Sequence, residues 1–432
     1  MKRNTEFETE CTDLSDQGYG VCRYRDEIVF VPGLLPTEKA RVRIVYPSSR
    51  FSIGKAITRY TDSPARQEPL CPAASQCGGC MLQHMQYKDQ LTWKTKWMKR
   101  LFKGVDVADT LGSTDYYYRN KAQFPVAVKD GKVISGFYRP HSHDIVDTEA
   151  CAIQQQEINA IYHWLRNNLS VSTAQYLRHI LIRHSQKTGQ SQVVFIGTKN
   201  RFKPIARKLA AAFPSIVSVV FNKNEREDNV ILGEEYEVLH GSDSIVEDCL
   251  GLQIDLHFKS FFQVNPVMME VLYEKALELA DLKETDQVID MYSGTGTIGL
   301  LAARKAGQVT GVEIVEEAVE NARRNARRNG VDNAMFVCAD ATEFARHYKE
   351  EGKKADVLFV DPPRKGLTEQ GIEDIATIGP EKIVYVSCNP RTLKRDLDRF
   401  MDKGYVPGTI QPVDLFPQTP NVECVVLLSR TR

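Results

Sequence analysis

The feature that most constrains the fold is a regular alternation of short apolar strands and helices from about residue 282 onward. A chain of this pattern forms parallel strands joined by helical crossovers, with helices covering both faces of the sheet. The sequence therefore predicts a doubly wound, Rossmann-like α/β domain over residues 257–432. The expected strands are 288–292, 309–314, 334–337, 357–360 and 383–386, and the expected helices include 298–306 and 316–329.

A glycine-rich turn follows the first of these strands. Gly294, Gly296 and Gly299 satisfy the G-x-G-x-x-G pattern, which lets backbone and helix N-terminus approach a bound cofactor. Glu313 ends the second strand, where a carboxylate can meet ribose hydroxyls. These features fit a nicotinamide dinucleotide as well as S-adenosylmethionine.

Three aspartates favour S-adenosylmethionine. Asp290 lies four residues before the first glycine, where it can meet the ammonium group of the cofactor. Asp340 follows the third strand and can accept from the adenine amine. Asp361 ends the fourth strand and opens Asp361-Pro362-Pro363-Arg364, whose prolines form a rigid rim beside a reacting base. The alternative is that each aspartate caps a helix, but acids at four successive strand ends favour the cofactor.

Cys388 follows the apolar run 383–386 after one residue, Ser387. Sheets of this type place ligand-facing groups at the carboxyl ends of their strands, so the position suits a nucleophile. An inert buried thiol is the structural alternative.

Three more of the ten cysteines, Cys71, Cys77 and Cys80, lie within ten residues. Thiolates select zinc or iron-sulfur clusters, and Gly78-Gly79 would let the backbone wrap closely around a cluster. Cys151 is the best-placed fourth ligand. Structural zinc usually takes two close-spaced pairs, so three clustered ligands and one distant ligand favour a [4Fe-4S] cluster.

Short alternating strands precede the cysteines and predict an OB-like β-barrel over residues 1–62, a frequent RNA-binding module. Its basic side chains are candidates for phosphate contacts, although solvated strand faces are often charged. The expected strands are 20–24, 28–31, 40–45 and 51–57, and the basic residues are Arg41, Arg43, Arg50, Lys55 and Arg59.

Mixed helices and strands predict a central α+β domain over 63–256 that carries the cluster. Its basic helix, about 87–103, is a candidate to dock on the C-terminal domain or to face RNA. The aromatic residues of 115–139 suit base stacking or a strand-rich core equally well.

Composition leaves the binding partner open. Lys+Arg and Asp+Glu balance at 56 each, so a polyanion must be held by local basic patches. No apolar stretch of about 18 residues is present, and residues 1–10 lack the apolar region of a signal peptide. We therefore expect a cytoplasmic protein without a membrane span, and the sequence predicts no protein partner.

In combination, these residues resemble the RNA 5-methyluridine methyltransferases, specifically the iron-sulfur branch that acts on uridines of bacterial 23S ribosomal RNA. The similarity extends over nearly the whole chain and identifies the N-terminal barrel as a TRAM domain. It rests on the four cysteines 71, 77, 80 and 151 and on the segments 261–265, 290–296, 361–364, 387–390 and 422–423.

The resemblance implies that Gln263, Tyr292, Glu313 and Asp361 bind the cofactor. Cys388 would be the nucleophile, and the general base would be Glu423. The tRNA branch of the family lacks both barrel and cysteine cluster, so the resemblance favours 23S ribosomal RNA. Two departures are Thr37, where the family often has glycine, and Asp340, where relatives carry asparagine.

The implied chemistry follows from uracil itself, whose C5 is a poor nucleophile. Thiolate addition at C6 by Cys388 converts the ring to an enolate that takes the methyl group, and Glu423 then removes the C5 proton. The target uridine must be flipped out or lie in a loop, because a stacked helix shields C5 and C6. A tRNA uridine or RNA cytosine C5 methyltransferase, or a non-catalytic RNA-binding iron-sulfur protein, are the alternatives.

Overall fold

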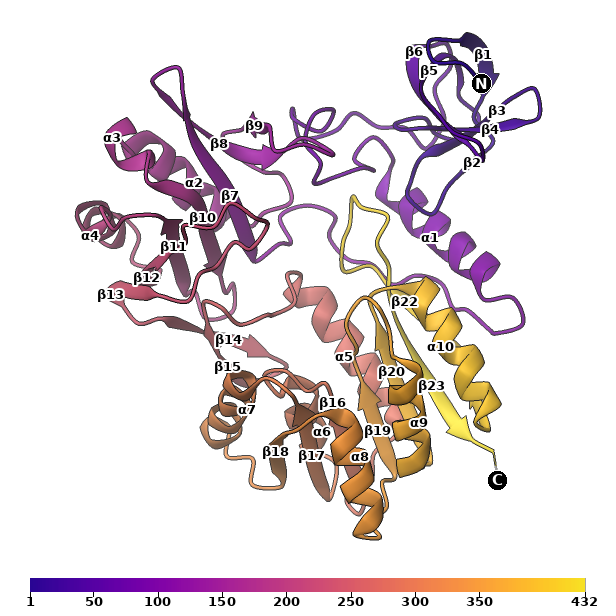
Figure 1. Cartoon of the computed structure of the whole chain (residues 1–432), viewed down its shortest axis with the longest axis vertical. Coiled ribbons are helices and arrows are strands. Elements are labelled where there is room, and N and C mark those ends of the chain that lie inside the picture. The colour runs from indigo at the N-terminus through magenta and orange to yellow at the C-terminus, as the bar shows by residue number, and fades with distance from the viewer. Residues whose placement is uncertain (432) are drawn as a thin grey trace.

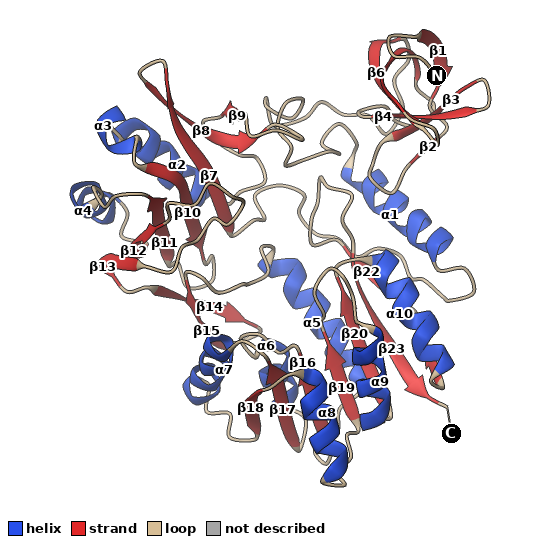
Figure 2. Ribbon diagram, in the orientation of Figure 1, coloured by secondary structure: helices blue, strands red, loops and turns tan. Residues whose placement is uncertain are grey.

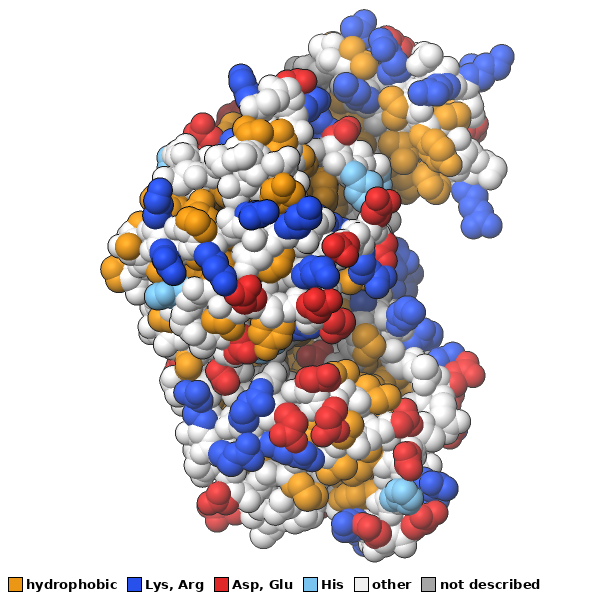
Figure 3. All heavy atoms as spheres, turned by 60° about the vertical axis from the view of Figure 1, so that its left-hand side comes forward, with side chains coloured by type: hydrophobic (Ala, Val, Ile, Leu, Met, Phe, Trp, Pro, Cys, Tyr) orange, Lys and Arg blue, Asp and Glu red, His pale blue; other side chains and the backbone are white. Residues whose placement is uncertain are grey.

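The structure, a computed structural model, describes residues 1–431. Three large sheets follow one another along the chain, and each forms the core of a separate lobe (Figure 1). The N-terminal and central lobes stand side by side, and the C-terminal lobe lies below both in this view. Positive and negative side chains are intermingled over the central and lower parts of the surface, as the balanced composition predicts (Figure 3).

The N-terminal lobe is a six-stranded sheet of order β1-β5-β6-β4-β3-β2. Along β5, Ala40, Val42 and Ile44 are buried and alternate with exposed Arg41 and Arg43, so one face forms the core. All four predicted strands are present, and two short strands precede them. The bounds are β1 (Glu6–Glu10), β2 (Asp13–Leu14), β3 (Gly20–Tyr24), β4 (Glu27–Val31), β5 (Lys39–Pro47) and β6 (Ser52–Arg59).

The central lobe is a seven-stranded sheet of order β13-β12-β11-β10-β7-β8-β9, packed against helices. The helix residues Ile158, Tyr162 and Phe202 share one apolar cluster with the strand residues Phe124 and Phe195. The helices are α2 (Gln156–Asn168), α3 (Val171–Ala174) and α4 (Lys203–Ala212). The strands are β7 (Lys121–Lys129), β8 (Lys132–Tyr138), β9 (Ile145–Asp147), β10 (Leu177–His184), β11 (Ser191–Gly197), β12 (Ile216–Lys223) and β13 (Tyr236–Gly241).

A two-stranded hairpin, β14 (Ser244–Cys249) and β15 (Leu252–His257), links the central and C-terminal lobes. Ile254 and Leu256 on its apolar side belong to the same cluster as the C-terminal sheet. The predicted domain boundary at 256/257 therefore falls at the end of a hairpin that packs on the C-terminal core.

The C-terminal lobe is an eight-stranded sheet with the path β18-β17-β16-β19-β20-β23-β21, and β22 pairs with β23. The five strands β18, β17, β16, β19 and β20 are parallel, whereas β23 runs antiparallel to β20. The bounds are β16 (Gln287–Met291), β17 (Gln308–Glu313), β18 (Ala334–Cys338), β19 (Val357–Val360), β20 (Lys382–Ser387), β21 (Tyr405–Pro407), β22 (Gln411–Val413) and β23 (Glu423–Arg430).

Helices cover both faces of this sheet (Figure 2), which confirms the doubly wound α/β domain. One apolar cluster contains α5, α6 and α7, and a second contains α8, α9 and α10. The bounds are α5 (Pro266–Ala280), α6 (Thr297–Ala303), α7 (Glu316–Arg328), α8 (Ala341–Glu350), α9 (Glu369–Ile378) and α10 (Pro390–Asp402).

The basic helix predicted at 87–103 is α1 (Tyr87–Leu101), and it lies beside α10 (Figure 1). Met98 and Phe102 join the apolar cluster of the C-terminal sheet, whereas Trp93 packs with Leu14 and Leu82. Helix α1 thus bridges the N-terminal and C-terminal lobes. Within residues 1–431, no helix is long and apolar enough to cross a membrane.

Candidate active site

The predicted site residues of the C-terminal lobe gather at one edge of its sheet. Asp290 lies in β16, Glu313 is the last residue of β17, Asp361 directly follows β19, and Cys388 directly follows β20. These four strands are parallel neighbours, so their carboxyl ends meet at the same edge. The edge is where sheets of this class bind their ligands.

Glu423 reaches this edge from the opposite direction. The antiparallel ladder of β20 and β23 pairs Ser387 with Cys424. Cys388 and Glu423 are the next residues beyond this last pair, and they are close enough for the charge of Glu423 to raise the pKa of Cys388. Cys388 is half-buried and Glu423 is only 3% exposed. A thiol and a carboxyl group therefore meet in a mostly dry site.

Burial sets the protonation of this pair. It raises the pKa of Glu423 to about 8, with Asp361 raising it further and Arg364 opposing the shift. Burial likewise raises the pKa of Cys388 to about 11, with Glu423 and Asp361 as further causes and Arg364 again opposing them. The resting site thus holds a thiol, and positive charge brought to it would favour the reactive thiolate.

The glycine turn is shaped for close approach. Gly296 has φ +82°, and a Cβ added there would lie 2.7 Å from the ring of Phe336. Tyr292, which is not a glycine, has φ +65°, a strained conformation of the kind that clusters at functional sites.

Asp290 is buried beneath the turn and accepts a hydrogen bond from the backbone N–H of Gly299 at 2.8 Å. Burial raises its pKa to about 7. Its second oxygen, Oδ1, makes no hydrogen bond to another side chain among the described residues. One carboxylate oxygen thus binds the backbone of helix α6, and within residues 1–431 the other is free of side-chain hydrogen bonds.

Glu313 and Asp340 occupy different local roles. Glu313 accepts from the N–H of Gly294 at 3.1 Å and from those of Ile314 and Val315, so it joins the glycine turn to the end of β17. Asp340 is exposed and caps α8, accepting from the N–H of Thr342 at 2.9 Å. The structure therefore gives Asp340 the capping role that was the alternative to adenine binding, and its contact with adenine stays a prediction.

Tyr292 directly follows β16 and so lies at this edge, whereas Gln263 lies in the segment before α5. Gln263 is 9% exposed, and its carbonyl accepts a hydrogen bond from the Asn120 side chain at 3.2 Å. The pKa of Tyr292 is raised by burial and then by the carboxylates of Asp340 and Asp374. The Tyr292 hydroxyl thus faces an acidic neighbourhood, which suits contact with a hydroxyl or amine.

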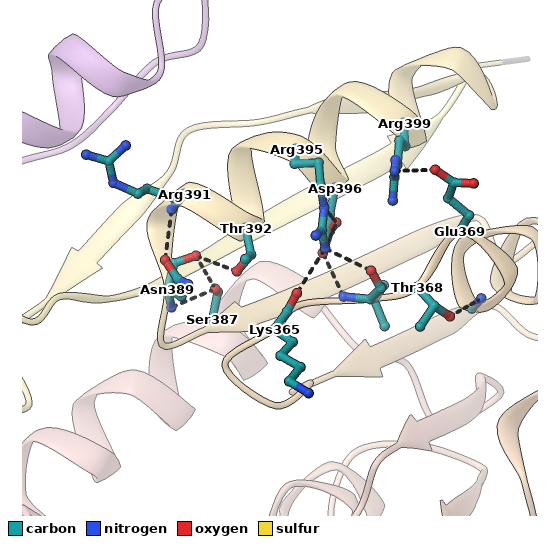
Figure 4. Close-up of polar contacts among 12 residues, drawn as sticks. Lys365, Thr368, Glu369, Ser387, Asn389, Arg391, Thr392, Arg395, Asp396 and Arg399 are labelled. Carbon is teal, nitrogen blue, oxygen red and sulfur yellow. Dashed lines mark hydrogen bonds and ion pairs between the residues drawn. The ribbon is translucent and has the colours of Figure 1, made fainter. Parts of the chain in front are cut away.

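The rim that carries Arg364 is held by Asp396, which sequence analysis missed, and by Asn389 of the segment 387–390; Figure 4 shows both side chains. Asp396 is fully buried in α10 and accepts from the N–H of Leu367 at 2.8 Å and the Tyr385 hydroxyl at 2.7 Å. Asn389 donates to the carbonyl of Arg364 at 3.0 Å. Nothing in the local pattern singled out Asp396, because its partners come from a strand and a loop distant in sequence.

The four cysteines predicted as ligands line one cavity of about 230 Å³ in the central lobe. Burial raises the pKa of Cys80 to about 12, with the thiols of Cys151, Cys77 and Cys71 adding to the shift, so the four sulfur groups lie near one another. Among residues 1–431, no three His, Cys, Asp or Glu side chains converge on a single metal ion.

The donor set distinguishes two kinds of metal group. A single zinc needs all four sulfurs about 2.3 Å from one ion. A four-iron cluster places each thiolate on a different iron, so its sulfurs stand around a larger volume. The four thiols that line this cavity offer the number of thiolate ligands that such a cluster would need.

Three of the six aromatic residues predicted either to stack on bases or to form a core are buried or pack against the core: Tyr118, Phe124 and Phe137. Phe124 is fully buried and stacks on Tyr162 with ring centroids 3.7 Å apart, and Tyr118 is 4% exposed. Only Tyr117 among the three consecutive tyrosines is counted as exposed, at 42%.

Comparison with known proteins covers nearly the whole chain. Residues 86–431 match the family model described as tRNA (uracil-5-)-methyltransferase. An uncharacterized RNA methyltransferase of Clostridium tetani is 40% identical, covering 99% of this chain and 97% of its own. A Bacillus cereus relative with the same description is 38% identical, covering 100% and 98%.

One solved structure matches over almost the full length. It is Pyrococcus abyssi tRNA (uracil-54, C5)-methyltransferase in complex with S-adenosyl-L-homocysteine. The TM-score is 0.78 at 27% sequence identity, and the match covers 98% of this chain and 100% of that one.

Proposed function

Because the chain belongs to the tRNA (uracil-5-)-methyltransferase family and is an RNA methyltransferase, we propose that it methylates C5 of uridine in 23S ribosomal RNA through a covalent Cys388 adduct. The methyl donor is S-adenosylmethionine. The proposal is supported by the closeness of Cys388 and Glu423 at the end of the β20–β23 ladder, beside Asp361.

The residues present fit the methyl donor. Asp290 offers a buried carboxylate at the glycine turn, and Glu313 stands at the end of the next strand. S-adenosylmethionine supplies an electrophilic methyl group on a positively charged sulfur. Asp290, Asp361 and Glu313 are carboxyl groups at this edge, and a bound cation favours their ionised forms.

The reaction then uses two groups of this chain. The Cys388 thiol gives its proton to water, and the thiolate adds to C6 of uracil. The electron pair moved to C5 takes the methyl group while S-adenosylhomocysteine leaves. Glu423 accepts the C5 proton, the C5–C6 double bond re-forms, and the bond from sulfur to C6 breaks. Arg364 favours the thiolate, because its guanidinium lowers the pKa of Cys388.

Replacing the nucleophile tests this mechanism. Cys388→Ala should abolish methyl transfer to RNA and keep S-adenosylmethionine binding, measured by calorimetry. The matched control is Cys338→Ala, which removes an exposed thiol on β18 and should keep full activity. Full activity of Cys388→Ala would exclude the covalent route.

We also propose that Cys71, Cys77, Cys80 and Cys151 hold a [4Fe-4S] cluster, supported by their shared cavity. Protein purified without oxygen should be brown and contain about four iron atoms per chain. A colourless protein with one zinc would refute the cluster, and loss of colour in Cys151→Ser would support the distant fourth ligand.

For the RNA target we propose 23S ribosomal RNA, bound in part by the N-terminal lobe acting as a TRAM-type barrel. Exposed Tyr46 and Tyr60 and basic Lys55 lie on strands β5 and β6 or beside them, and suit contact with bases and phosphates. We further propose that the protein acts in the cytoplasm, which fractionation of cells would test.

A tRNA target is the second candidate, favoured by the Pyrococcus abyssi match. That tRNA enzyme is matched over 98% of this chain, so the N-terminal region alone does not separate the two targets. Mapping 5-methyluridine in ribosomal and transfer RNA from cells with and without the protein decides between them. Loss of the modification from 23S ribosomal RNA supports the proposal, and loss only from tRNA refutes it.

A further inference from the structure

The loop 414–422 connects β22 to β23 and ends at Glu423. Val413 pairs with Glu423 in the ladder of β22 and β23. The two ends of the loop therefore lie side by side, and one of them is Glu423, the residue proposed as the base. Gln418, in the middle of the loop, is fully buried and has φ +68°. A buried glutamine in the left-handed region is strained, and surrounding contacts must hold it there.

Gln418 makes hydrogen bonds to three upstream segments. Its carbonyl accepts from the N–H groups of Met81 at 2.9 Å and Leu82 at 3.0 Å. Its side-chain oxygen accepts from Gln90 at 2.9 Å, and its own N–H donates back to Gln90 at 3.0 Å. Its side-chain nitrogen donates to Asp115 at 3.1 Å. Both polar atoms of its side chain are therefore satisfied by groups outside the loop.

Neighbouring contacts hold the same loop. Lys94 of α1 and Asp414 form an ion pair at 2.7 Å with both side chains fully buried. The Tyr118 hydroxyl donates to the carbonyl of Pro417 at 3.0 Å. At the far end, the N-terminal lobe packs its Gly18 turn against Pro420, where an added Cβ would be 3.8 Å from the proline. All three lobes thus contribute to the environment of this loop.

Met81 directly follows Cys80, which lines the cysteine cavity. The backbone hydrogen bonds from Met81 and Leu82 to Gln418 therefore join the cysteine segment to the loop that ends at Glu423. We propose that Gln418 is a positioning residue that holds Glu423 close to Cys388, and that the cysteine segment sets this position. The inference rests on the proposed function, in which Glu423 removes the C5 proton.

Gln418→Gly removes only the side-chain hydrogen bonds of this residue. Glycine adopts φ +68° freely, and the backbone hydrogen bonds to Met81 and Leu82 can remain. A displacement of the base by about 1 Å slows the step it catalyses on the order of 10²-fold. We expect a fall in kcat of that order and a parallel fall in the KM for RNA, because a slow step after adduct formation leaves kcat/KM nearly unchanged. A denaturant-resistant protein–RNA adduct should accumulate, because addition and methyl transfer precede proton removal.

Gln90→Met removes the partner and should give the same adduct, and the double variant should add little to either single change. The matched control is Gln192→Ala, which removes a fully buried glutamine hydrogen-bonded to Ser218 in the central sheet. That variant should lose stability without accumulating adduct. If Gln418 had only a structural role, Gln418→Gly would behave like this control and lose stability without accumulating adduct.

Hydrogen exchange tests the connection to the cysteine segment without measuring activity. Cys80→Ser should speed exchange at the amides of Met81 and Leu82 and in a peptide covering 414–422. Unchanged exchange there would overturn the connection. Wild-type turnover of Gln418→Gly without adduct would overturn the positioning role while leaving the methyltransferase proposal intact, whereas absence of methylation by the wild-type protein would overturn both.

Discussion

Glu423 enters the reaction as a buried carboxyl group that must lose its proton before it can accept another from C5. Burial raises its pKa to about 8. The ionised fraction is therefore about a tenth at pH 7, a half at pH 8 and nine tenths at pH 9. We predict that the rate constant for collapse of the adduct rises about tenfold between pH 7 and pH 9.

The collapse step can be observed apart from thiol ionisation, because Cys388 is already bonded to C6 in the adduct. RNA carrying tritium at uridine C5 releases the label to water when Glu423 takes the proton. The adduct should be formed at pH 7 and then moved to a series of pH values in a rapid-quench instrument. Tritium release should follow the ionisation of one group with a midpoint near pH 8.

Arg364→Met provides a directional control. Arg364 lowers the pKa of Glu423, so its removal should move the midpoint to higher pH. Glu423→Gln should abolish the pH-dependent release. A release rate that is flat from pH 7 to pH 9, or a midpoint unchanged by Arg364→Met, would refute the assignment of Glu423 as base.

Other predictions concern stability. Lys94→Met leaves Asp414 as an unpaired buried carboxylate and should lower the free energy of unfolding by about 3–5 kcal/mol, whereas Lys99→Met, at an exposed pair, should cost at most about 1 kcal/mol in urea titrations. Burial raises the pKa of Asp361 from 3.8 to about 7. The protonated group therefore contributes fully to the free energy of unfolding below about pH 4, and this contribution is lost as pH rises through 7. Asp361→Asn should remove this part of the pH dependence of thermal unfolding in the cofactor-free protein. Thr37 has φ +77°, so Thr37→Gly should raise the melting temperature, and a decrease would show that the strain is not relieved.

The fold of the C-terminal lobe could be predicted because local pattern and tertiary structure agree there. The apolar strands 357–360 and 383–386 were expected within a residue of β19 and β20, since buried parallel strands are continuous apolar runs. Helix α8 was missed, although Asp340 followed three residues later by Glu343 is a helix-start signal. Asp340 had been assigned to adenine instead.

What the sequence could not provide were contacts between distant segments. Cys388 and Glu423 meet through the pairing of β20 with β23, and a register shift of one residue would turn Glu423 to the other face. Lys94 belongs to the basic helix predicted at about 87–103, yet it is fully buried against Asp414, which lies 320 residues away. Gln418 and Asp396 were missed for the same reason, since their partners come from other lobes or elements.

The covalent bond between Cys388 and uracil C6 is the central claim, and mass spectrometry of a trapped complex tests it most directly. Glu423→Gln protein is incubated with RNA and S-adenosylmethionine, denatured, digested with protease and nuclease, and the peptides are sequenced. We predict a peptide containing Cys388 that carries one methylated uridine nucleotide. A nucleotide attached to any other residue, or methylated RNA released with no adduct, would contradict the mechanism.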